Sequence, residues 1–98
     1  MQLKIHESYR KIIALADSNL IGKTFTQDNK QIEVRANFFQ GEEKNKSELL
    51  SILKDMDKED ATFYIVGKES IESALEAGII LQQGIITINK IPVALGLL

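Results

Sequence analysis

The sequence contains no cysteine and a single histidine. The absence of cysteine excludes disulfide bonds, thiolate nucleophiles, iron–sulfur clusters and zinc sites built from thiolates. One imidazole, that of His6, is too little for a zinc site without cysteine ligands, so we expect no metal and no other cofactor. Because the sequence shows neither a disulfide framework nor an N-terminal signal-peptide pattern, it predicts a cytoplasmic protein.

Long hydrophobic runs and a large net charge are also missing. The apolar tail at residues 91–98 is far too short to span a bilayer, so we expect no membrane contact. The net charge of −2 leaves no strongly basic footprint for nucleic acid. Residues 1–46 hold eight Lys and Arg against six Asp and Glu, whereas residues 47–98 hold four against eight. The surplus in the first half is either a small basic patch or ordinary solvated charge.

The rest of the composition is typical of a folded domain. Hydrophobic residues make up 44% of the 98 residues and charged residues 27%, as in an ordinary globular protein. A chain of this length buries roughly 65% of its unfolded surface, which is enough for a core without metal or disulfide support. The sequence therefore predicts one globular domain over residues 1–98.

Hydrophobic periodicity predicts an α/β (α+β-like) fold in the order ββ-turn-ββαβαββ, with two helices packed on a mixed sheet of about six strands. The clearest helix follows Asn45 and Glu48, which form a capping-box pattern ahead of an apolar stripe. A buried-type strand, "TFYIV", leads through Gly67 into a second helix that ends at Gly78. The expected strands cover residues 3–6, 11–16, 23–26, 31–35, 62–66, 85–88 and 91–95, and the first helix covers about 46–57.

The last expected strand contains the only proline, Pro92. Proline cannot donate to a strand ladder, so this pattern predicts that the strand lies at an edge of the sheet. An apolar edge strand can pair with a second copy across a two-fold axis. The tail "IPVALGLL" is therefore a candidate for homodimer formation through the C-terminal edge strand.

Gly22-Lys23-Thr24 has the three letters that close a phosphate-binding P-loop. That motif needs a glycine five residues earlier, where this chain has Asp17, whose carboxylate would repel phosphate. It also needs a helix after the threonine, whereas the pattern here predicts a strand. We therefore interpret Gly22 as the end of a short helical turn that follows Asp17.

Phe38 and Phe39 are half of the four phenylalanines in the chain. Adjacent side chains in an extended segment point to different sides, so we expect at most one of them in the deep core. A stacking platform for a nucleobase is one interpretation. Packing in the core or in a satellite cluster is the more common use of such residues.

Catalytic chemistry has little support in the sequence. His6 alternates with Ile5 in a half-buried strand, so we expect its imidazole to face solvent. No nucleophile-elbow motif is present, and no carboxylate lies in an apolar setting that would raise its pKa. We therefore predict no catalytic residues and consider an enzyme the weaker hypothesis.

The junction between strand 62–66 and the following helix is a candidate anion site. Free backbone N–H groups at a helix start favour anions, and the side chains of Lys68 and Ser70 would add donors. Lys23 is a candidate second wall, whereas Glu69 would oppose an anion. The alternative is that Ser70 only caps the helix.

Four segments taken together resemble the DUF424 family of small archaeal proteins. In the first segment Asp17, Gly22 and Lys23 match the family pattern of an acid followed by Leu-Gly-Lys, and in the second Phe38 and Gly41 match. Glu42, Val66, Gly67, Gly78, Pro92 and Ala94 also match. The segments are "DSNLIGKTF" (17–25), "NFFQGE" (37–42), "YIVGKESIESALEAGII" (64–80) and "IPVAL" (91–95).

Some positions depart from the family pattern. Phe39 and Gln40 differ from the second motif, and Val93 and Leu95 replace a polar pair in the last. The resemblance implies an archaeal, cytosolic protein with a loose connection to information processing. It implies no known activity.

These observations favour a non-enzymatic binding module for RNA or a translation-related protein, with Lys23 and Arg35 near the family motifs. A self-associating structural protein and a weak anion or nucleotide binder are the alternatives. The candidate binding residues are Lys23, Gly41, Gly67, Lys68 and Ser70.

Overall fold

The computed structural model describes residues 1–95, and the central strands of its sheet lie on apolar runs of the sequence. Six strands form one mixed sheet in the order β5-β1-β2-β6-β8-β7, and β3 and β4 form a separate hairpin. The strands are β1 (Gln2–His6), β2 (Ile12–Ala16), β3 (Thr24–Gln27), β4 (Lys30–Glu33), β5 (Glu42–Glu43), β6 (Thr62–Val66), β7 (Ile86–Ile88) and β8 (Ile91–Leu95). The helices are η1 (Ser18–Leu20), α1 (Ala36–Phe39), α2 (Lys46–Lys58), α3 (Lys68–Ala77) and η2 (Gln82–Gly84).

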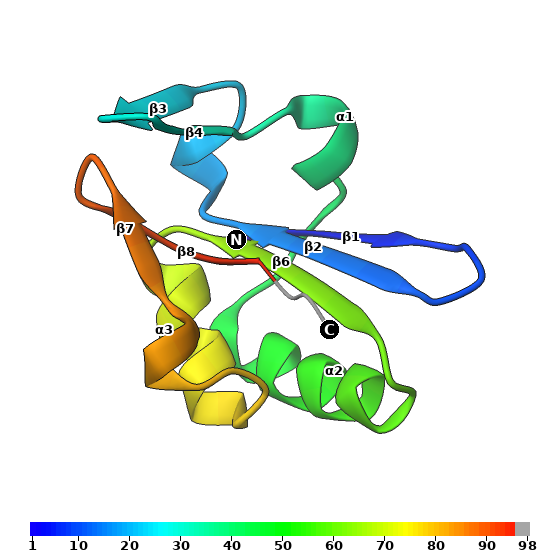
Figure 1. Ribbon diagram of the computed structural model, residues 1–98. Coiled ribbons are helices and arrows are strands. Elements are labelled where there is room, and N and C mark those ends of the chain that lie inside the picture. The colour runs from blue at the N-terminus through cyan, green and yellow to red at the C-terminus, as the bar shows by residue number, and fades with distance from the viewer. Residues whose placement is uncertain (96–98) are drawn as a thin grey trace.

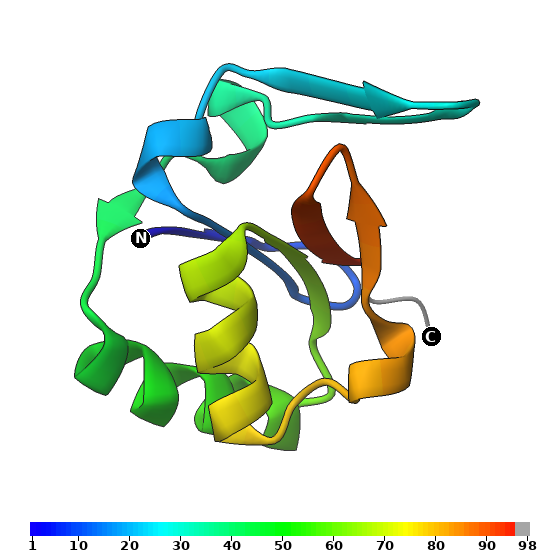
Figure 2. The same ribbon diagram turned by 90° about the vertical axis from the view of Figure 1, so that its left-hand side faces the viewer.

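The sheet separates two layers. Helices α2 and α3 cover one face, and the β3–β4 hairpin with α1 lies over the other (Figure 1). Seen from the side, the hairpin lies above the turn between β7 and β8 (Figure 2), where the Asn89 amide donates to the Gln27 side chain at 2.6 Å. The predicted mixed six-stranded sheet with two packed helices is confirmed by this arrangement.

The two central strands of the sheet contribute side chains to both hydrophobic cores. β2 and β6 are parallel, with Ile12 opposite Thr62 and Ala16 opposite Val66. Ile13, Leu15 and Ile65 are fully buried beneath the sheet, where Leu49 and Leu53 of α2 join the same core. Side chains of a strand alternate between faces, so Ala14 and Ala16 point to the other side. These small residues leave room for Phe39 of α1 in the upper core.

Helix α2 begins as the sequence predicts. The Asn45 side chain accepts a hydrogen bond from the Glu48 amide at 2.9 Å, and the Glu48 carboxylate accepts one from the Asn45 amide at 3.0 Å. This reciprocal capping box satisfies two backbone donors that the helix itself cannot satisfy.

The expectation that Pro92 places the last strand at an edge is wrong, because β8 lies between β6 and β7. The Pro92 carbonyl accepts a hydrogen bond from the Gly67 amide at 2.9 Å, so the backbone polar groups of Pro92 face the end of β6. The acceptor opposite the missing N–H is the Gly67 carbonyl, which instead accepts the first helical hydrogen bond from Ile71 at 2.9 Å. Proline fits an internal strand here because its neighbour has already turned into a helix.

Besides the short turn η2, two elements were not expected from the sequence. The strand expected at residues 31–35 ends at Glu33, and the short helix α1 follows it. The two-residue strand β5 then pairs with Gln2 and Leu3 of β1. Both elements are too short to show a periodic pattern, so long-range contacts decide their conformation.

Candidate functional site

A cavity of about 320 Å³ opens between the β4–α1 segment and the upper face of the sheet. Its floor is formed by Tyr64 of β6 and Leu95 of β8, which are directly opposite each other in the sheet. Its other walls are Ile32, Glu33, Arg35, Asn37, Phe38 and Phe39. We call this cavity the aromatic cleft.

Phe38 is the fixed centre of the aromatic cleft. Its ring stacks on the His6 imidazole with a centroid distance of 4.5 Å and an interplanar angle of 18°. It meets Phe39 at 5.0 Å and Tyr64 at 5.4 Å, both edge to face. Such contacts stabilise an aromatic pair by about 0.5–1.5 kcal/mol beyond area burial, so Phe38 forms a preorganised wall. Phe39 is 3% exposed and Phe38 is half-buried, so no more than one of the two lies in the deep core, as predicted, although the segment is helical and not extended.

The expectation that His6 faces solvent is wrong. Its Nε2 atom donates a hydrogen bond of 2.8 Å to the Phe38 carbonyl, and its ring is half-buried against Phe38. The reason is α1, which the sequence pattern did not predict and which lies over the first strand in Figure 1. The imidazole therefore positions the aromatic wall.

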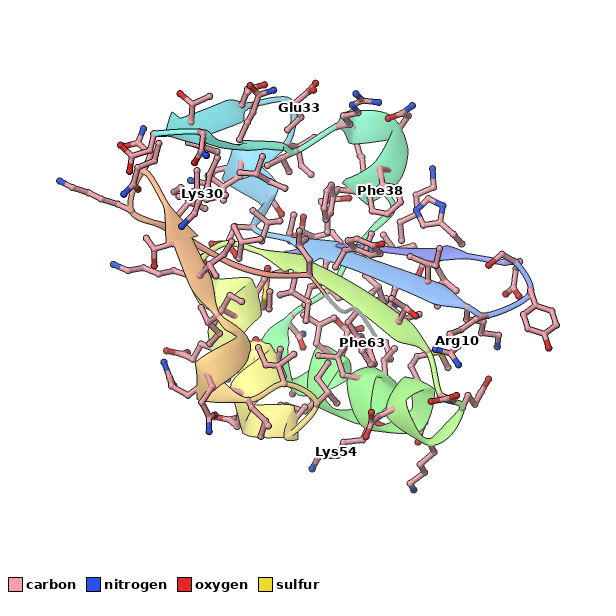
Figure 3. All side chains as sticks on the ribbon, in the orientation of Figure 1. Arg10, Lys30, Glu33, Phe38, Lys54 and Phe63 are labelled. Carbon is pink, nitrogen blue, oxygen red and sulfur yellow. The ribbon has the colours of Figure 1, made fainter. Side chains whose placement is uncertain are left out.

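The charged side chains at the aromatic cleft lie at its rim. A guanidinium nitrogen of Arg35 is 3.4 Å from the Glu33 carboxylate, and both side chains are largely exposed. Glu33 lies on the outer side of the hairpin and points away from Phe38, whereas Phe63 lies on the opposite face of the sheet (Figure 3). The interior of the cleft is therefore mainly apolar.

The candidate anion site at the start of α3 already holds a carboxylate. Asp17 Oδ1 accepts a hydrogen bond from the Ser70 amide at 2.8 Å and another from the Ser70 hydroxyl at 2.7 Å. Asp17 Oδ2 accepts one from the Glu69 amide at 3.2 Å. Asp17 is only 6% exposed, so an external anion at Gly67, Lys68 and Ser70 would compete with a resident, buried carboxylate.

The alternative, that Ser70 only caps the helix, is also wrong. Ser70 is the third residue of α3, is fully buried, and donates its hydroxyl to Asp17. It does not cap the helix, because the cap comes from Asp17 on a different segment. Asp17 likewise does not cap η1 with its side chain, although it precedes that turn.

Gly67 makes room for this cap. Its φ of 111° and ψ of 156° are strained for any residue with a side chain. A Cβ atom at Gly67 would lie 2.6 Å from Asp17 Oδ1 and 2.7 Å from Oδ2. Glycine is therefore required both by the backbone conformation and by the neighbouring carboxylate.

The cap by Asp17 was not predicted, although the sequence carries a signal for it. An acid directly follows one buried strand, and Gly67 directly follows another. The parallel register of Ala16 with Val66 brings the two strand ends together, and the Asp17 amide donates to the Val66 carbonyl at 3.1 Å. A parallel pairing of these two strands would have predicted the contact.

The other two candidate residues lie elsewhere. Lys23 is exposed, and its carbonyl accepts from the Val34 amide at 2.8 Å. Gly41 passes close to β1, since a Cβ there would lie 3.0 Å from the Lys4 Cα atom. Within residues 1–95, neither shares a hydrogen bond with Gly67, Lys68 or Ser70.

Metal ligands and membrane-spanning helices are both missing from the described part of the chain. Within residues 1–95, no three His, Cys, Asp or Glu side chains lie together as ligands for a metal ion. No helix in the same range is long and apolar enough to cross a bilayer.

Comparisons with known proteins give a family and a fold. The family model described as "Protein of unknown function (DUF424)" matches residues 5–96. The crystal structure of an uncharacterized conserved protein from Methanopyrus kandleri superposes with a TM-score of 0.83 at 16% sequence identity. The match covers 95% of this chain and 86% of that one, and at this identity it shows the fold alone. No curated protein matches the chain.

Proposed function

The chain belongs to the DUF424 family of proteins of unknown function, and we propose that it is a non-enzymatic binding module. The aromatic cleft is the proposed site. The observation that carries this proposal is the wall formed by Phe38, which three ring contacts and one backbone hydrogen bond hold in place. A rigid aromatic wall loses little conformational entropy when a ligand binds against it.

The size of the aromatic cleft supports a role in recognition. Ligand pockets usually measure about 300–1,000 Å³, so a cavity of about 320 Å³ suits one side chain or one base better than a large cofactor. His6 uses its Nε2 atom for the Phe38 carbonyl, which favours positioning over proton transfer. We therefore place binding ahead of catalysis.

RNA and a protein of the translation apparatus are the two ligand classes within this proposal. Lys23 and Arg35 flank the same end of the β3–β4 hairpin, because the Lys23 carbonyl bonds to the residue before Arg35. For RNA, these cations would contact phosphates while a base stacks in the cleft. For a protein, an apolar side chain would fill the cleft instead.

An affinity-capture experiment with a matched pair of variants tests the proposal. Leu95 is 41% exposed at the cleft, and Leu81 is 71% exposed on a different segment. We expect wild-type protein and the Leu81→Asp variant to retain RNA or ribosome-associated protein from an archaeal lysate, and the Leu95→Asp variant to lose it. A parallel capture with ribonuclease separates the two ligand classes. Equal recovery by all three proteins would remove the cleft from the proposal.

Self-association is the second candidate function, and we assign it to β7 instead of β8. β8 has neighbours on both sides, whereas β7 is the terminal strand of the sheet and carries Ile86, which is 43% exposed. An exposed apolar edge strand favours pairing with a second copy. Residues 96–98 of the tail lie outside the described residues. Sedimentation of wild-type protein and Ile86→Lys at high micromolar concentration tests this candidate, and a monomeric wild type would reject it.

A further inference from the structure

The outer edge of β4 presents backbone hydrogen-bonding groups beside the aromatic cleft. The Val34 amide donates to the Lys23 carbonyl at 2.8 Å, which makes Lys23 and Val34 a hydrogen-bonded pair. Such pairs alternate with non-bonded pairs along an antiparallel hairpin. Phe25 and Ile32 are therefore the next bonded pair. Gln31 and Glu33 belong to non-bonded pairs, so their backbone N–H and C=O groups point away from β3. Within residues 1–95, β4 pairs with no other strand.

The side chains around this edge complete a recognition surface. Ile32 of β4 lines the aromatic cleft and Glu33 lies at its rim, with Tyr64 and Leu95 as its floor. A strand that paired with Gln31 and Glu33 would run along the mouth of the cleft. Because successive side chains of a strand point to opposite sides, one residue in two would face the cleft.

We propose that an extended peptide from a protein partner adds as a strand to the outer edge of β4 and places one apolar side chain in the aromatic cleft. This inference rests on the proposed function, because it uses the same cleft, and it selects protein over RNA. Main-chain hydrogen bonds supply affinity in this mode of recognition, and the pocket for alternate side chains supplies specificity.

The charged side chains along the outer edge of β4 indicate which charges the peptide carries. Lys30 begins β4 and Arg35 follows it, against the single carboxylate of Glu33 over residues 30–39. Within the described residues Lys30 has no salt bridge, and the Arg35–Glu33 contact of 3.4 Å is long and exposed. Charge complementarity therefore favours a peptide with acidic residues beside its apolar anchor. Two cations are few for RNA, whose affinity depends on many phosphate contacts.

The edges beside β1 and β3 fit a peptide less well. β5 already covers Gln2 and Leu3 of β1, and Gly41 passes close over that edge. The outer edge of β3 presents Thr24 and Thr26, which are exposed and do not line the aromatic cleft. β4 combines a free edge with an apolar cavity.

A displayed library of random nonapeptides is the probe for the test. Selection on the wild-type protein, with Leu95→Asp protein for counter-selection, should enrich peptides that carry one aromatic or large aliphatic residue near acidic residues. The best peptide is then titrated into ¹⁵N-labelled protein. We expect amide shifts at Gln31, Glu33 and the cleft residues. A selection that enriches no peptide would overturn the inference.

Three variants separate strand addition from simple filling of the cleft. Glu33→Pro removes an outward N–H while the bonds between β3 and β4 stay intact, and we expect it to weaken peptide binding about three- to tenfold. Thr24→Pro removes the equivalent outward N–H from the opposite edge, and Glu33→Ala removes only the side chain. Both should bind within about twofold of wild type, because neither deletes a main-chain contact to the peptide.

A second measurement uses only the wild-type protein. Alternate backbone nitrogens of the bound peptide face β4, and the nitrogens between them point away from it. Methylation of the first set should abolish binding, whereas methylation of the second set should not. If both methylated peptides bind equally and fill the cleft, strand addition is wrong and the proposed function stands. If random-sequence RNA shifts the cleft residues and no peptide does, the ligand is RNA. If neither shifts them, the proposed function itself fails.

Discussion

Asp17 and Ser70, which are 53 residues apart, are joined by two hydrogen bonds to one carboxylate oxygen. This oxygen accepts the backbone amide of Ser70 at 2.8 Å and its hydroxyl at 2.7 Å. A carboxylate at a helix N-terminus satisfies unpaired N–H groups and interacts favourably with the helix dipole. The contact therefore ties the end of β2 to the start of α3 and supports the central parallel pair of strands.

Asp17→Ala should lower the free energy of unfolding by about 2–3 kcal/mol, because it leaves buried amides without a charged acceptor. Urea denaturation monitored by circular dichroism measures the change. Asp55→Ala is the control, since Asp55 is exposed on α2 and surface substitutions usually change stability by less than about 0.5 kcal/mol. Equal effects of the two substitutions would show that the cap by Asp17 contributes no more to the free energy of unfolding than an exposed carboxylate does.

Removing this carboxylate should also create the anion site that the sequence suggested. In the Asp17→Ala protein the amides of Glu69 and Ser70 lose their acceptor, so phosphate should raise the melting temperature by a few degrees. Sodium chloride at matched ionic strength should not have this effect. Wild-type protein should not respond to phosphate, because Asp17 occupies the position. A phosphate response of the wild type would instead support anion binding at Gly67, Lys68 and Ser70.

The sequence predicted the parts of the fold that depend on local pattern. The apolar run of β6 and the capping box before α2 are local signals, and both elements lie where the sequence placed them. Pro92 was misplaced because its tolerance depends on Gly67, a residue far away in the sequence. His6 was misplaced because α1, which packs over β1, is too short to be predicted from periodicity.

The candidate site was predictable to a smaller extent. Phe38 and Phe39 were identified as a pair with one member outside the deep core. The aromatic cleft also needs Tyr64 and Leu95, which only the pairing of β6 with β8 brings together. The cap by Asp17 depends in the same way on the pairing of β2 with β6. Contacts between distant segments carry both features, and a single sequence gives no direct measure of strand register.

Gly67→Ala should destabilise the protein by at least about 2 kcal/mol, since alanine is strained at a φ of 111° and its Cβ would collide with Asp17. Gly78→Ala is the matched control. Gly78 also has a positive φ, 77°, but nothing lies within 4 Å of its Cβ position, so we expect a cost of about 1 kcal/mol. In the Asp17→Ala background the cost of Gly67→Ala should fall, which a double-mutant cycle measures. A strictly additive cycle would contradict the proposed collision.

Gly41→Ala should loosen the pairing of β1 with β5. A Cβ at Gly41 would meet the carbonyl group of Leu3 and would lie 3.0 Å from the Lys4 Cα atom, so the two strands must move apart. We expect a loss of about 1–3 kcal/mol and faster hydrogen exchange of the β5 amides. Gly84→Ala is the control, because nothing lies within 4 Å of its Cβ position. Unchanged exchange in the Gly41 variant would show that β5 does not depend on this close approach.

Lys46 of α2 forms ion pairs with α3, so its contribution to stability should depend on pH. Its ammonium lies 3.0 Å from the Glu72 carboxylate and 3.1 Å from that of Glu76. The hydrogen bond with Glu72, and then that with Glu76, raises the pKa of Lys46 above its ordinary value of 10.5. A raised pKa in the folded state means that the contribution to stability is complete below pH 10.5 and disappears as the pH rises through the folded-state pKa.

The difference in unfolding free energy between wild type and Lys46→Met should therefore be constant near neutral pH and vanish in strong alkali. Parallel urea titrations from neutral pH into the alkaline range measure this difference. Lys54→Met is the control, because Lys54 lies on the same helix and forms no salt bridge within the described residues. This control measures the effect of a lysine-to-methionine change on α2 that removes no ion pair. A difference for Lys46→Met that persists unchanged above the folded-state pKa would show that the methylene groups of Lys46, and not its charge, hold α2 against α3.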